Sequence, residues 1–358
     1  METRMKRLRE KMTEYSLDYL LVTDKVNRRY LTGFTGSNGL LLIGKNSNHL
    51  IVDGRYTEQA QQQTSNTTIL TTSSSKNQWV YASEFINGGN VGFEVETIPY
   101  QVFKDLKSLT KEMDIRLVET NHLIEKLRLI KSEQELFCLR KAAQLADQAF
   151  SYITTIIKPG MSELDVANEI DYYSKRIGSE GPAFETIVAS GKRTALPHAH
   201  ASKKIIQKNE LIMIDFGCIF GGYYSDITRT FALGEVNEVI KKAYDQVLFA
   251  QKQAIEAITI GGKLKDIDKA ARDCLKKELL DRYFSHGLGH GIGLSCHEYP
   301  GVDRTSEERI IEGMTFTVEP GVYLAGDFGI RIEDDVYINS EGKAECLTQT
   351  KKEWMVIG

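Results

Sequence analysis

The sequence predicts an α+β protein of two domains, one spanning residues 1–124 and the other residues 125–358. A chain of 358 residues is longer than one hydrophobic core usually organises. Strand-like and helix-like segments alternate in the first third of the chain, which favours an α/β layer domain with a mixed or parallel sheet. The remainder contains two similar stretches in the same order, which indicates an internally duplicated α+β domain.

The composition is ordinary for a soluble globular protein, with 41% hydrophobic and 26% charged residues. The net charge of −4 offers no electrostatic reason to expect nucleic acid or an anionic membrane as a partner. No apolar run approaches the roughly 18 residues of a membrane span, and no apolar segment of a signal peptide follows the charged start. The five cysteines are scattered without CxxC spacing, so we expect free thiols in a reducing cytoplasm.

Short apolar and β-branched runs predict the strands of the first domain, and helical patterns are expected at the N-terminus and near 55–63, 77–87 and 98–109. We find no catalytic grouping in this half. Asp53 and Arg55 are more typical of a salt-bridged turn than of a functional pair. The predicted strands are DYLLVT, GLLLIG, NHLIVD, TTILTT and IRLVET.

The second domain contains two strong helical patterns. Apolar residues spaced three and four apart from Leu136 to Ile157 form one stripe of an amphipathic helix. Ser162, followed three residues later by Asp165, is the N-cap pattern of the next helix. A second stripe runs from Val236 to Ala254, ends at Gly261-Gly262 and is followed by another helix.

Landmarks of the first stretch recur in the second at a slowly increasing offset. Gly160 recurs as Gly262 after 102 residues, Asp215 as Glu319 after 104, and Asp226 as Glu333 after 107. Chance similarity between two amphipathic α+β stretches is the alternative. Three landmarks in one order favour a duplication with small loop insertions.

Each repeat places two carboxylates in a hairpin where apolar residues are expected. Asp215 and Asp226 have their midpoint at 220–221, within FGG, and Glu319 and Glu333 have theirs at 326, within AGD. Directly opposed residues of an antiparallel hairpin share a face. Each hairpin is therefore predicted to present two carboxylates side by side, and the duplication would bring the two faces together.

Four converging carboxylates in an apolar sheet predict a metal centre, because desolvation and mutual repulsion oppose their ionisation. The segment 286–300 adds His286, His290 and His297, three of the seven histidines of the chain. His290 lies among glycines, where the backbone can approach a site closely. Four carboxylates and one imidazole suit Mn²⁺, and also Co²⁺ or Zn²⁺, and they suit two ions about 3.5 Å apart better than one.

These motifs resemble those of the pita-bread-fold metallopeptidases, in the group of Xaa-Pro dipeptidases (prolidases) and aminopeptidase P. The resemblance implies a creatinase-like α/β N-terminal domain, which provides dimer contacts and substrate access, and a catalytic pita-bread domain whose duplicated helices pack on a curved antiparallel sheet. It also implies a cytoplasmic homodimer. The segments YLTGFTGSNG and VDGRYTEQA resemble the N-terminal domain, and IDFG, YSDITRT, HGLGHGIGL, VEPGVY and RIEDD resemble the catalytic signature.

The resemblance implies that two divalent ions, most often Mn²⁺, are shared by Asp226 and Glu333. Asp215 would bind one ion, and His290 and Glu319 the other. A water held between the ions would lose a proton to become the hydroxide nucleophile, and Glu319 would accept that proton and pass it on.

Histidines complete the implied site. His198, in TALPHAHAS, matches the family histidine near the scissile amide and is preferred to His200 on the family pattern alone. His297 matches the histidine that binds the scissile carbonyl and stabilises the oxyanion. His286 matches a wall of the substrate pocket, and Arg331 is expected to bind a substrate group or pair with carboxylates; structural roles for both stay open.

The implied activity is hydrolysis of an N-terminal Xaa-Pro bond in a small peptide. The proline nitrogen has no N–H and its ring restricts φ, so such a bond needs a dedicated site. The sequence leaves open the choice between dipeptides and longer peptides, the preferred first residue and the physiological metal. Five intact ligands disfavour a creatinase-like amidinohydrolase and a peptidase-dead peptide-binding module, and the extra N-terminal domain disfavours a methionine aminopeptidase.

Overall fold

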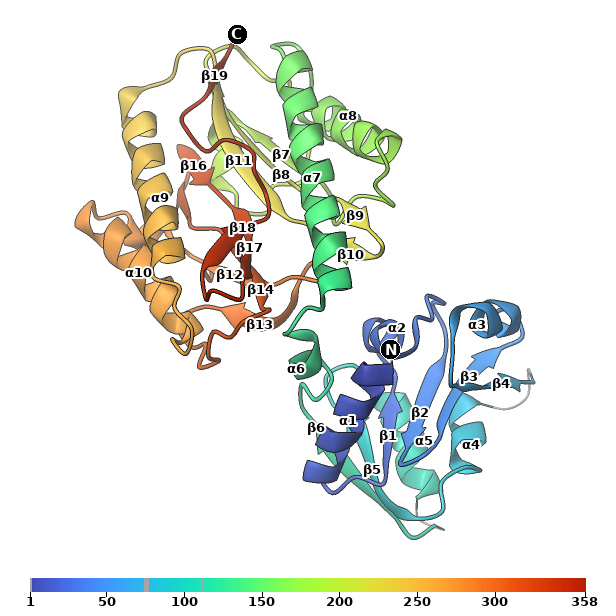
Figure 1. Cartoon of the computed structure of the whole chain (residues 1–358). Helices are drawn as coiled ribbons and strands as arrows, with labels where there is room; N and C mark the ends of the chain where they lie inside the picture. The colour runs from blue at the N-terminus through green and yellow to red at the C-terminus, as the bar shows by residue number, and fades with distance from the viewer. Residues whose placement is uncertain (1, 74–76, 111–112) are drawn as a thin grey trace. The chain divides into compact units, whose positions relative to one another are not determined.

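The computed structural model describes residues 2–73, 77–110 and 113–358, which form two compact units (Figure 1). The first unit ends at Arg128 and the second covers Leu129–Gly358. Both combine helices and sheets, which confirms the α+β class. Within the described residues, no helix is both long and apolar enough to cross a bilayer. The functional division into domains 1–124 and 125–358 stays a prediction.

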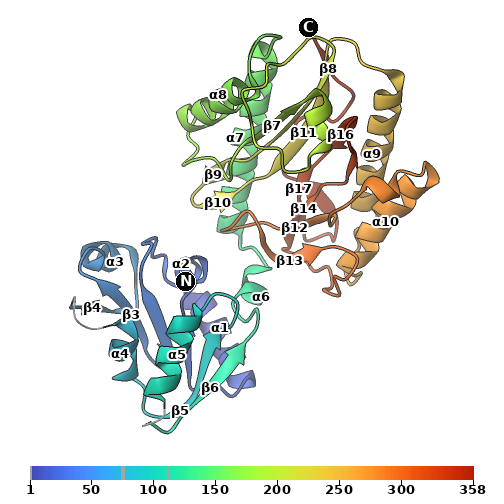
Figure 2. The same cartoon turned by 180° about the vertical axis from the view of Figure 1, so that it is seen from behind.

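A six-stranded mixed sheet, in the order β4-β3-β2-β1-β5-β6, forms the centre of the first unit. Helices cover both of its faces, with α1 on one and α5 on the other (Figures 1 and 2). The strands are β1 (Tyr19–Val22), β2 (Leu40–Gly44), β3 (Asn48–Asp53), β4 (Thr68–Thr72), β5 (Gly89–Glu94) and β6 (Ile115–Thr120), and the helices are α1 (Glu2–Glu14), α2 (Lys25–Thr32), α3 (Thr57–Gln63), α4 (Gln78–Ser83), α5 (Tyr100–Leu109) and α6 (Glu125–Arg128).

The sequence did not predict β5 and α2. β5 contains Gly89 and Gly92, and glycine is depleted in strands. A Cβ at Gly92 would lie 2.8 Å from Leu17 Cδ1, so a larger residue there would require the leucine side chain to move. Helix α2 begins at the cap Asp24 and ends at Gly33, whose φ is 83°.

In the second unit, α7 and α8 pack on the strands of the first half, and α9 and α10 pack on the strands of the second half (Figure 1). The main sheets have the orders β19-β11-β8-β7 and β13-β12-β14-β17-β18. The helices are α7 (Glu133–Ile156), α8 (Glu163–Arg176), α9 (Glu238–Glu256) and α10 (Leu264–Lys277), with short 3₁₀ turns at Gly191–Ala195 and Asp281–Tyr283. The strands are β7 (Ile187–Ser190), β8 (Glu210–Phe216), β9 (Ile219–Phe220), β10 (Tyr223–Tyr224), β11 (Ile227–Leu233), β12 (Gly289–Gly291), β13 (Glu298–Val302), β14 (Thr315–Val318), β15 (Gly321–Leu324), β16 (Phe328–Arg331), β17 (Asp334–Ile338), β18 (Ala344–Cys346) and β19 (Val356–Ile357).

Equivalent backbone hydrogen bonds confirm the duplication. In each half, the segment that begins the second helix is bonded to the segment that leads into the carboxylate hairpin. Gly160 corresponds to Gly261, with φ values of 96° and 83°, and not to Gly262 as the sequence indicated. In the first half, the N–H groups of Gly160 and Glu163 donate to the carbonyls of Ile206 and Lys204; in the second half, those of Gly261 and Leu264 donate to Ile310 and Glu308.

The first carboxylate hairpin has a different register from the one predicted. Asp215 pairs with Thr228, and the turn lies at Gly221–Gly222, where both φ values are positive as a tight hairpin turn requires. Because Asp226 is two residues from Thr228, it stays on the same face as Asp215. The second hairpin has the predicted register, with its turn at Gly326.

Arg229 joins the two halves directly behind the carboxylate hairpins. Its buried guanidinium donates to the backbone oxygens of Thr228 and Glu333, and its Nη2 lies 2.7 Å from Asp334 Oδ1. Asp334 is fully buried and also accepts a hydrogen bond from Lys352. This ion pair therefore connects β11 of the first half with β17 of the second.

We predict that Arg229→Met lowers the free energy of unfolding by about 3 to 5 kcal/mol, because it leaves a buried carboxylate without its main partner. Urea denaturation measures the change. The control is Arg140→Met, which removes an ion pair with Glu345 whose side chains are 47% and 38% exposed. The control should cost less than about 1 kcal/mol; equal losses in the two variants would contradict the prediction.

Candidate metal centre

A cavity of about 520 Å³ in the second unit is lined by both carboxylate hairpins and by the histidine-rich segment. Its volume is typical of a small-ligand site. The structure brings together in this cavity all the candidate residues that the sequence predicted: Asp215, Asp226, Glu319, Glu333, His198, His286, His290, His297 and Arg331, together with the alternative His200.

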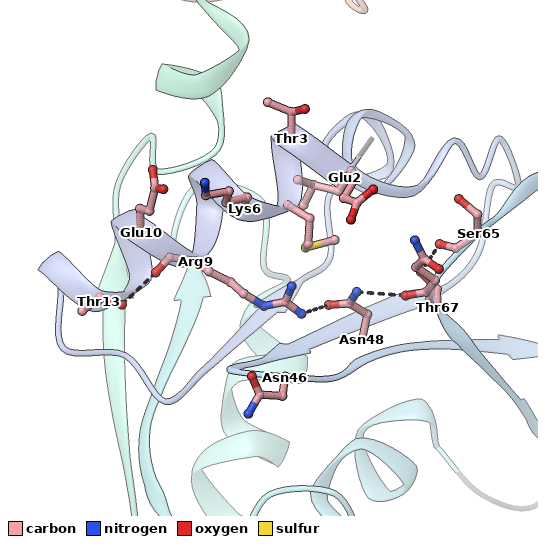
Figure 3. A pocket seen from close by; sticks show the side chains of 13 residues that line it. Glu2, Thr3, Lys6, Arg9, Glu10, Thr13, Asn46, Asn48, Ser65 and Thr67 are labelled. Carbon is pink, nitrogen blue, oxygen red and sulfur yellow. Dashed lines mark hydrogen bonds between the residues drawn. The ribbon is translucent and has the colours of Figure 1, made fainter.

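The first unit contains a larger hollow, of about 910 Å³, beside α1 and the turn between β2 and β3 (Figure 3). Its lining is rich in Asn, Ser and Thr and includes no histidine or cysteine among the described residues. Arg9 lies in it with Nη2 2.8 Å from Asn48 Oδ1 and Nε 3.1 Å from Gly44 O. The acidic residues of the hollow, Glu2 and Glu10, do not belong to a metal-ligand group among the described residues, so the smaller cavity is the candidate site.

Three side chains in the smaller cavity are arranged as metal ligands. Asp226, His290 and Glu333 offer ligand atoms that all lie within 4.8 Å of one another. Asp226 is 4% exposed and Glu333 is 1% exposed. The buried Oδ1 atoms of Asp215 and Asp226 have no hydrogen-bond partner among the described residues. Unpaired buried oxygens are costly, and a cation would satisfy them, so these residues fit a divalent metal.

His290 lies between the carboxylates of the two hairpins. Its Nε2 is 3.5 Å from Glu319 Oε1 and 3.7 Å from Asp226 Oδ2. Its backbone N–H donates to Thr317 Oγ1 at 3.1 Å, which ties β12 to the strand that precedes Glu319. The imidazole is therefore placed where one ion could contact both halves of the duplicated unit.

Burial dominates the electrostatics of the site. It raises the pKa of Asp226 and Glu333 well above the usual carboxyl range, and neighbouring carboxylates raise it further. Burial also raises the pKa of Glu319 to about 8, although Arg331 opposes the shift. Burial lowers the pKa of His290 to about 4, so its imidazole is neutral at pH 7, the form that binds metals.

A series of side-chain hydrogen bonds holds Asp215 in place. Arg331 Nη2 donates to Asp215 Oδ2 at 2.5 Å, and Nη1 donates to the Tyr323 hydroxyl at 2.6 Å. That hydroxyl lies 2.9 Å from His286 Nε2. Arg331 Nε also donates to Thr228 Oγ1 of the first hairpin. The Thr228 hydroxyl donates in turn to Glu333 Oε2 of the second hairpin. The geometry pairs Arg331 with a carboxylate; its contact with substrate stays a prediction.

Sequence reasoning missed Tyr323 and Thr228. The hairpin register contained the signal for the tyrosine, because it makes Tyr323 a diagonal neighbour of Arg331 on one face. Cys296 was also missed, and its Sγ donates to Asp226 Oδ2 at 3.2 Å. No local pattern marks this cysteine, since its contact depends on how the residue before β11 packs against the loop between β12 and β13.

The remaining histidines lie around the mouth of the cavity. The His297 ring stacks on His290 with centroids 3.8 Å apart. His198 is exposed, and burial is the main cause of the lowered pKa values of His286 and His297. The alternative histidine, His200, is exposed and its Nδ1 lies 3.0 Å from Glu185 Oε1.

Comparison with known proteins decides the family. Residues 138–340 match the model of metallopeptidase family M24, and residues 4–130 match the creatinase/prolidase N-terminal domain. This chain belongs to metallopeptidase family M24. The match to both models confirms the two-domain organisation, with a pita-bread catalytic unit, that the sequence motifs implied.

Relatives of this M24 chain resemble it over nearly their whole length. A Xaa-Pro dipeptidase of Pyrococcus horikoshii is 36% identical over 354 residues, 99% of each chain. A solved Xaa-Pro dipeptidase from Bacillus anthracis superposes with a TM-score of 0.94 at 38% identity, covering 99% of both chains. A solved X-Pro aminopeptidase from Thermotoga maritima gives a TM-score of 0.90 at 33% identity, again covering 99% of both. The family membership implies a divalent metal, and the carboxylate and histidine group is where it would bind.

We predict that the M24 chain, once stripped of metal by a chelator, loses thermal stability as pH rises from 6.5 to 8. With a pKa of about 8, folded Glu319 keeps a proton that the unfolded chain releases near pH 4.5, so stability falls with pH over this interval. The lowered pKa of His290 increases stability as pH rises from about 4 to 6.5, because the unfolded chain binds the extra proton there. Above pH 6.5 this histidine has little further effect on stability.

Scanning calorimetry measures this decline, which saturating Mn²⁺ should remove because it favours the ionised carboxylates. Glu319→Gln should make the decline shallower. A melting temperature of the stripped protein that increases over this pH interval would contradict the placement of the buried carboxyl groups.

Proposed function

We propose that this M24 chain is a dinuclear-metal exopeptidase that hydrolyses the bond between an N-terminal residue and a following proline. The observation that carries the proposal is the convergence in one cavity of Asp215, Asp226, Glu319, Glu333 and His290, from both halves of the duplicated unit. Relatives named as a Xaa-Pro dipeptidase and an X-Pro aminopeptidase support the choice of substrate class.

The proposed ligand set is that of two divalent ions. Asp226 and Glu333 would contact both ions, Asp215 one of them, and His290 with Glu319 the other. The oxygen-rich set favours Mn²⁺, with Co²⁺ or Zn²⁺ as alternatives. When bound, two such ions supply an ionised water at neutral pH.

The protein groups around this centre would move protons and hold the substrate. Glu319 is proposed to accept a proton from the attacking water and to pass it to the leaving nitrogen, which as a proline nitrogen has no N–H of its own. His297 is proposed to donate to the scissile carbonyl oxygen, and His198 to act beside the scissile amide. His286 would form one wall of the pocket.

The lining of the cavity favours peptides longer than dipeptides. Among its described residues, Arg331 is the only lysine or arginine, and its donors are directed to Asp215, Tyr323, Thr228 and a backbone carbonyl. The lining also includes Glu185, which is exposed at the mouth. A free carboxylate after proline would thus lack a lysine or arginine partner in the described lining, whereas the amide of a longer peptide needs none.

A peptidase assay tests this activity. With Mn²⁺, we expect cleavage of the first bond of Ala-Pro-Ala, and a lower kcat/KM for Ala-Pro. A chelator should abolish both activities, and the reloaded protein should contain about two ions per chain. Activity that is insensitive to chelation would overturn the metal mechanism, and a higher kcat/KM for the dipeptide would overturn only the length preference.

His198→Ala should lower kcat by about 10²-fold or more while both ions remain bound, because a proton-transfer or oxyanion contact is lost without loss of a ligand. Calorimetric titration with Mn²⁺ measures how many ions the variant binds per chain. The control is Cys218→Ser, since Cys218 is buried among the apolar residues that pack under α7 and α8 and does not line the cavity. A variant lacking His198 with unchanged kcat would remove this histidine from the mechanism.

We also propose a homodimer in the cytoplasm. All five cysteines of the structure are free thiols, which supports a reducing compartment. The dimer rests on the family resemblance alone, and sedimentation analysis that shows an active monomer would overturn it.

A further inference from the structure

The loop of residues 191–203, between β7 and β8, carries His198 to the cavity and is held by one buried carboxylate. Glu163, the first residue of α8, is 0% exposed. Its Oε1 accepts hydrogen bonds from the N–H and Oγ of Ser190, at 2.8 and 2.9 Å. Its Oε2 accepts from Arg193 Nε at 2.9 Å and from Ser202 Oγ at 2.7 Å. Of these donors, Ser190 precedes the loop, Arg193 lies within it and Ser202 lies near its end.

Further bonds tie the same loop close to His198. Arg193 Nη2 donates to the backbone oxygen of His200 at 2.7 Å. Arg331 Nη1, from the metal-site hairpin, donates to the backbone oxygen of Pro197 at 3.1 Å. Because Arg193 is itself bonded to Glu163, the carboxylate is connected by two hydrogen bonds to the backbone on the far side of His198.

The duplicated half shows that the start of the helix does not require a carboxylate. The position equivalent to Glu163 is occupied by Leu264, the first residue of α10, which is 0% exposed and packs in the apolar core. The N–H of Leu264 donates to Glu308 O at 3.0 Å, as the N–H of Glu163 donates to Lys204 O at 3.0 Å. A buried charge costs several kcal/mol unless hydrogen bonds compensate it. In the first half, that compensation comes from the loop.

We propose that Glu163 is a positioning residue that holds the loop in the conformation that presents His198 to the scissile amide. The inference rests on the proposed function, because it acts through the role of His198. Glu163 does not line the cavity and lies outside the proposed ligand set. Glu163→Gln keeps the shape of the side chain but replaces one acceptor oxygen with an NH₂ group that faces hydroxyl, N–H or guanidinium donors.

The main test is a double-mutant cycle with Glu163→Gln and His198→Ala in the Mn²⁺-loaded enzyme. Alone, Glu163→Gln should lower kcat about 10- to 100-fold, the scale of a misplacement of about 1 Å, with unchanged metal stoichiometry. In the His198→Ala background it should have no further effect on kcat, because the two residues act as one unit. An equal fold loss in both backgrounds would overturn the inference. Unchanged kcat in His198→Ala alone would instead overturn the proposed function.

Proteolysis provides a second readout. The loop and its end contain the trypsin sites Lys192, Arg193, Lys203 and Lys204. Glu163→Gln should accelerate cleavage at these sites, and an unchanged cleavage rate would overturn the inference.

Asp165→Asn is the matched control, because Asp165 caps the same helix start through Ser162 without touching the loop. It should lower the melting temperature but leave kcat and the cleavage rate within about twofold; losses equal to those of Glu163→Gln would overturn the inference. Should Glu163→Gln fail to fold, Ser202→Ala removes one donor to the same carboxylate and should show a smaller loss of kcat, again absent in the His198→Ala background.

Discussion

Repulsion among buried carboxylates is the constraint on which the catalytic unit depends. Asp226 and Glu333 are almost wholly buried, and burial together with their neighbours raises their pKa values. Protein cations offset part of this charge: Arg331 contacts Asp215 within the site, and Arg229 pairs with Asp334 behind it. The unpaired oxygens that remain point to metal ions as the missing counter-charge.

The duplication explains how so many charges can meet without unfolding the sheet. Each half contributes one hairpin with two carboxylates, and each hairpin is supported by its own pair of helices and their apolar cores. The halves then differ where chemistry is required. The second half contributes the segment with His286, His290 and His297, which includes β12, whereas the first contributes the loop with His198. The halves also differ at the first residue of the second helix, which is Glu163 in one half and Leu264 in the other. Only the loop with His198 is anchored by a buried carboxylate.

The first unit contains a large hollow but no candidate site of reaction among its described residues. Its sheet and helices match the creatinase/prolidase N-terminal domain, and it contains the larger of the two hollows described above. The described lining of that hollow has charged and polar side chains, including Glu2 and Glu10, but no cluster of metal-ligand side chains. Volume alone therefore does not identify the site of reaction, whereas convergent titratable groups do. The roles of this unit in assembly and substrate access stay predictions.

The sequence by itself determined the features that depend on local periodicity and spacing. These include the helices α7 to α10, the capping pair Ser162 and Asp165, the turn at Gly326 and the convergence of four carboxylates with one histidine. The sequence predicted the wrong register for the first hairpin, because its turn lies at the glycine pair Gly221–Gly222 and not at 220–221. Only the tertiary structure decided β5, where Gly89 and Gly92 leave room for side chains that are distant in the sequence. The supports of the site, such as Cys296 and Glu163, emerged only there, because each joins segments that folding, and not sequence spacing, brings together.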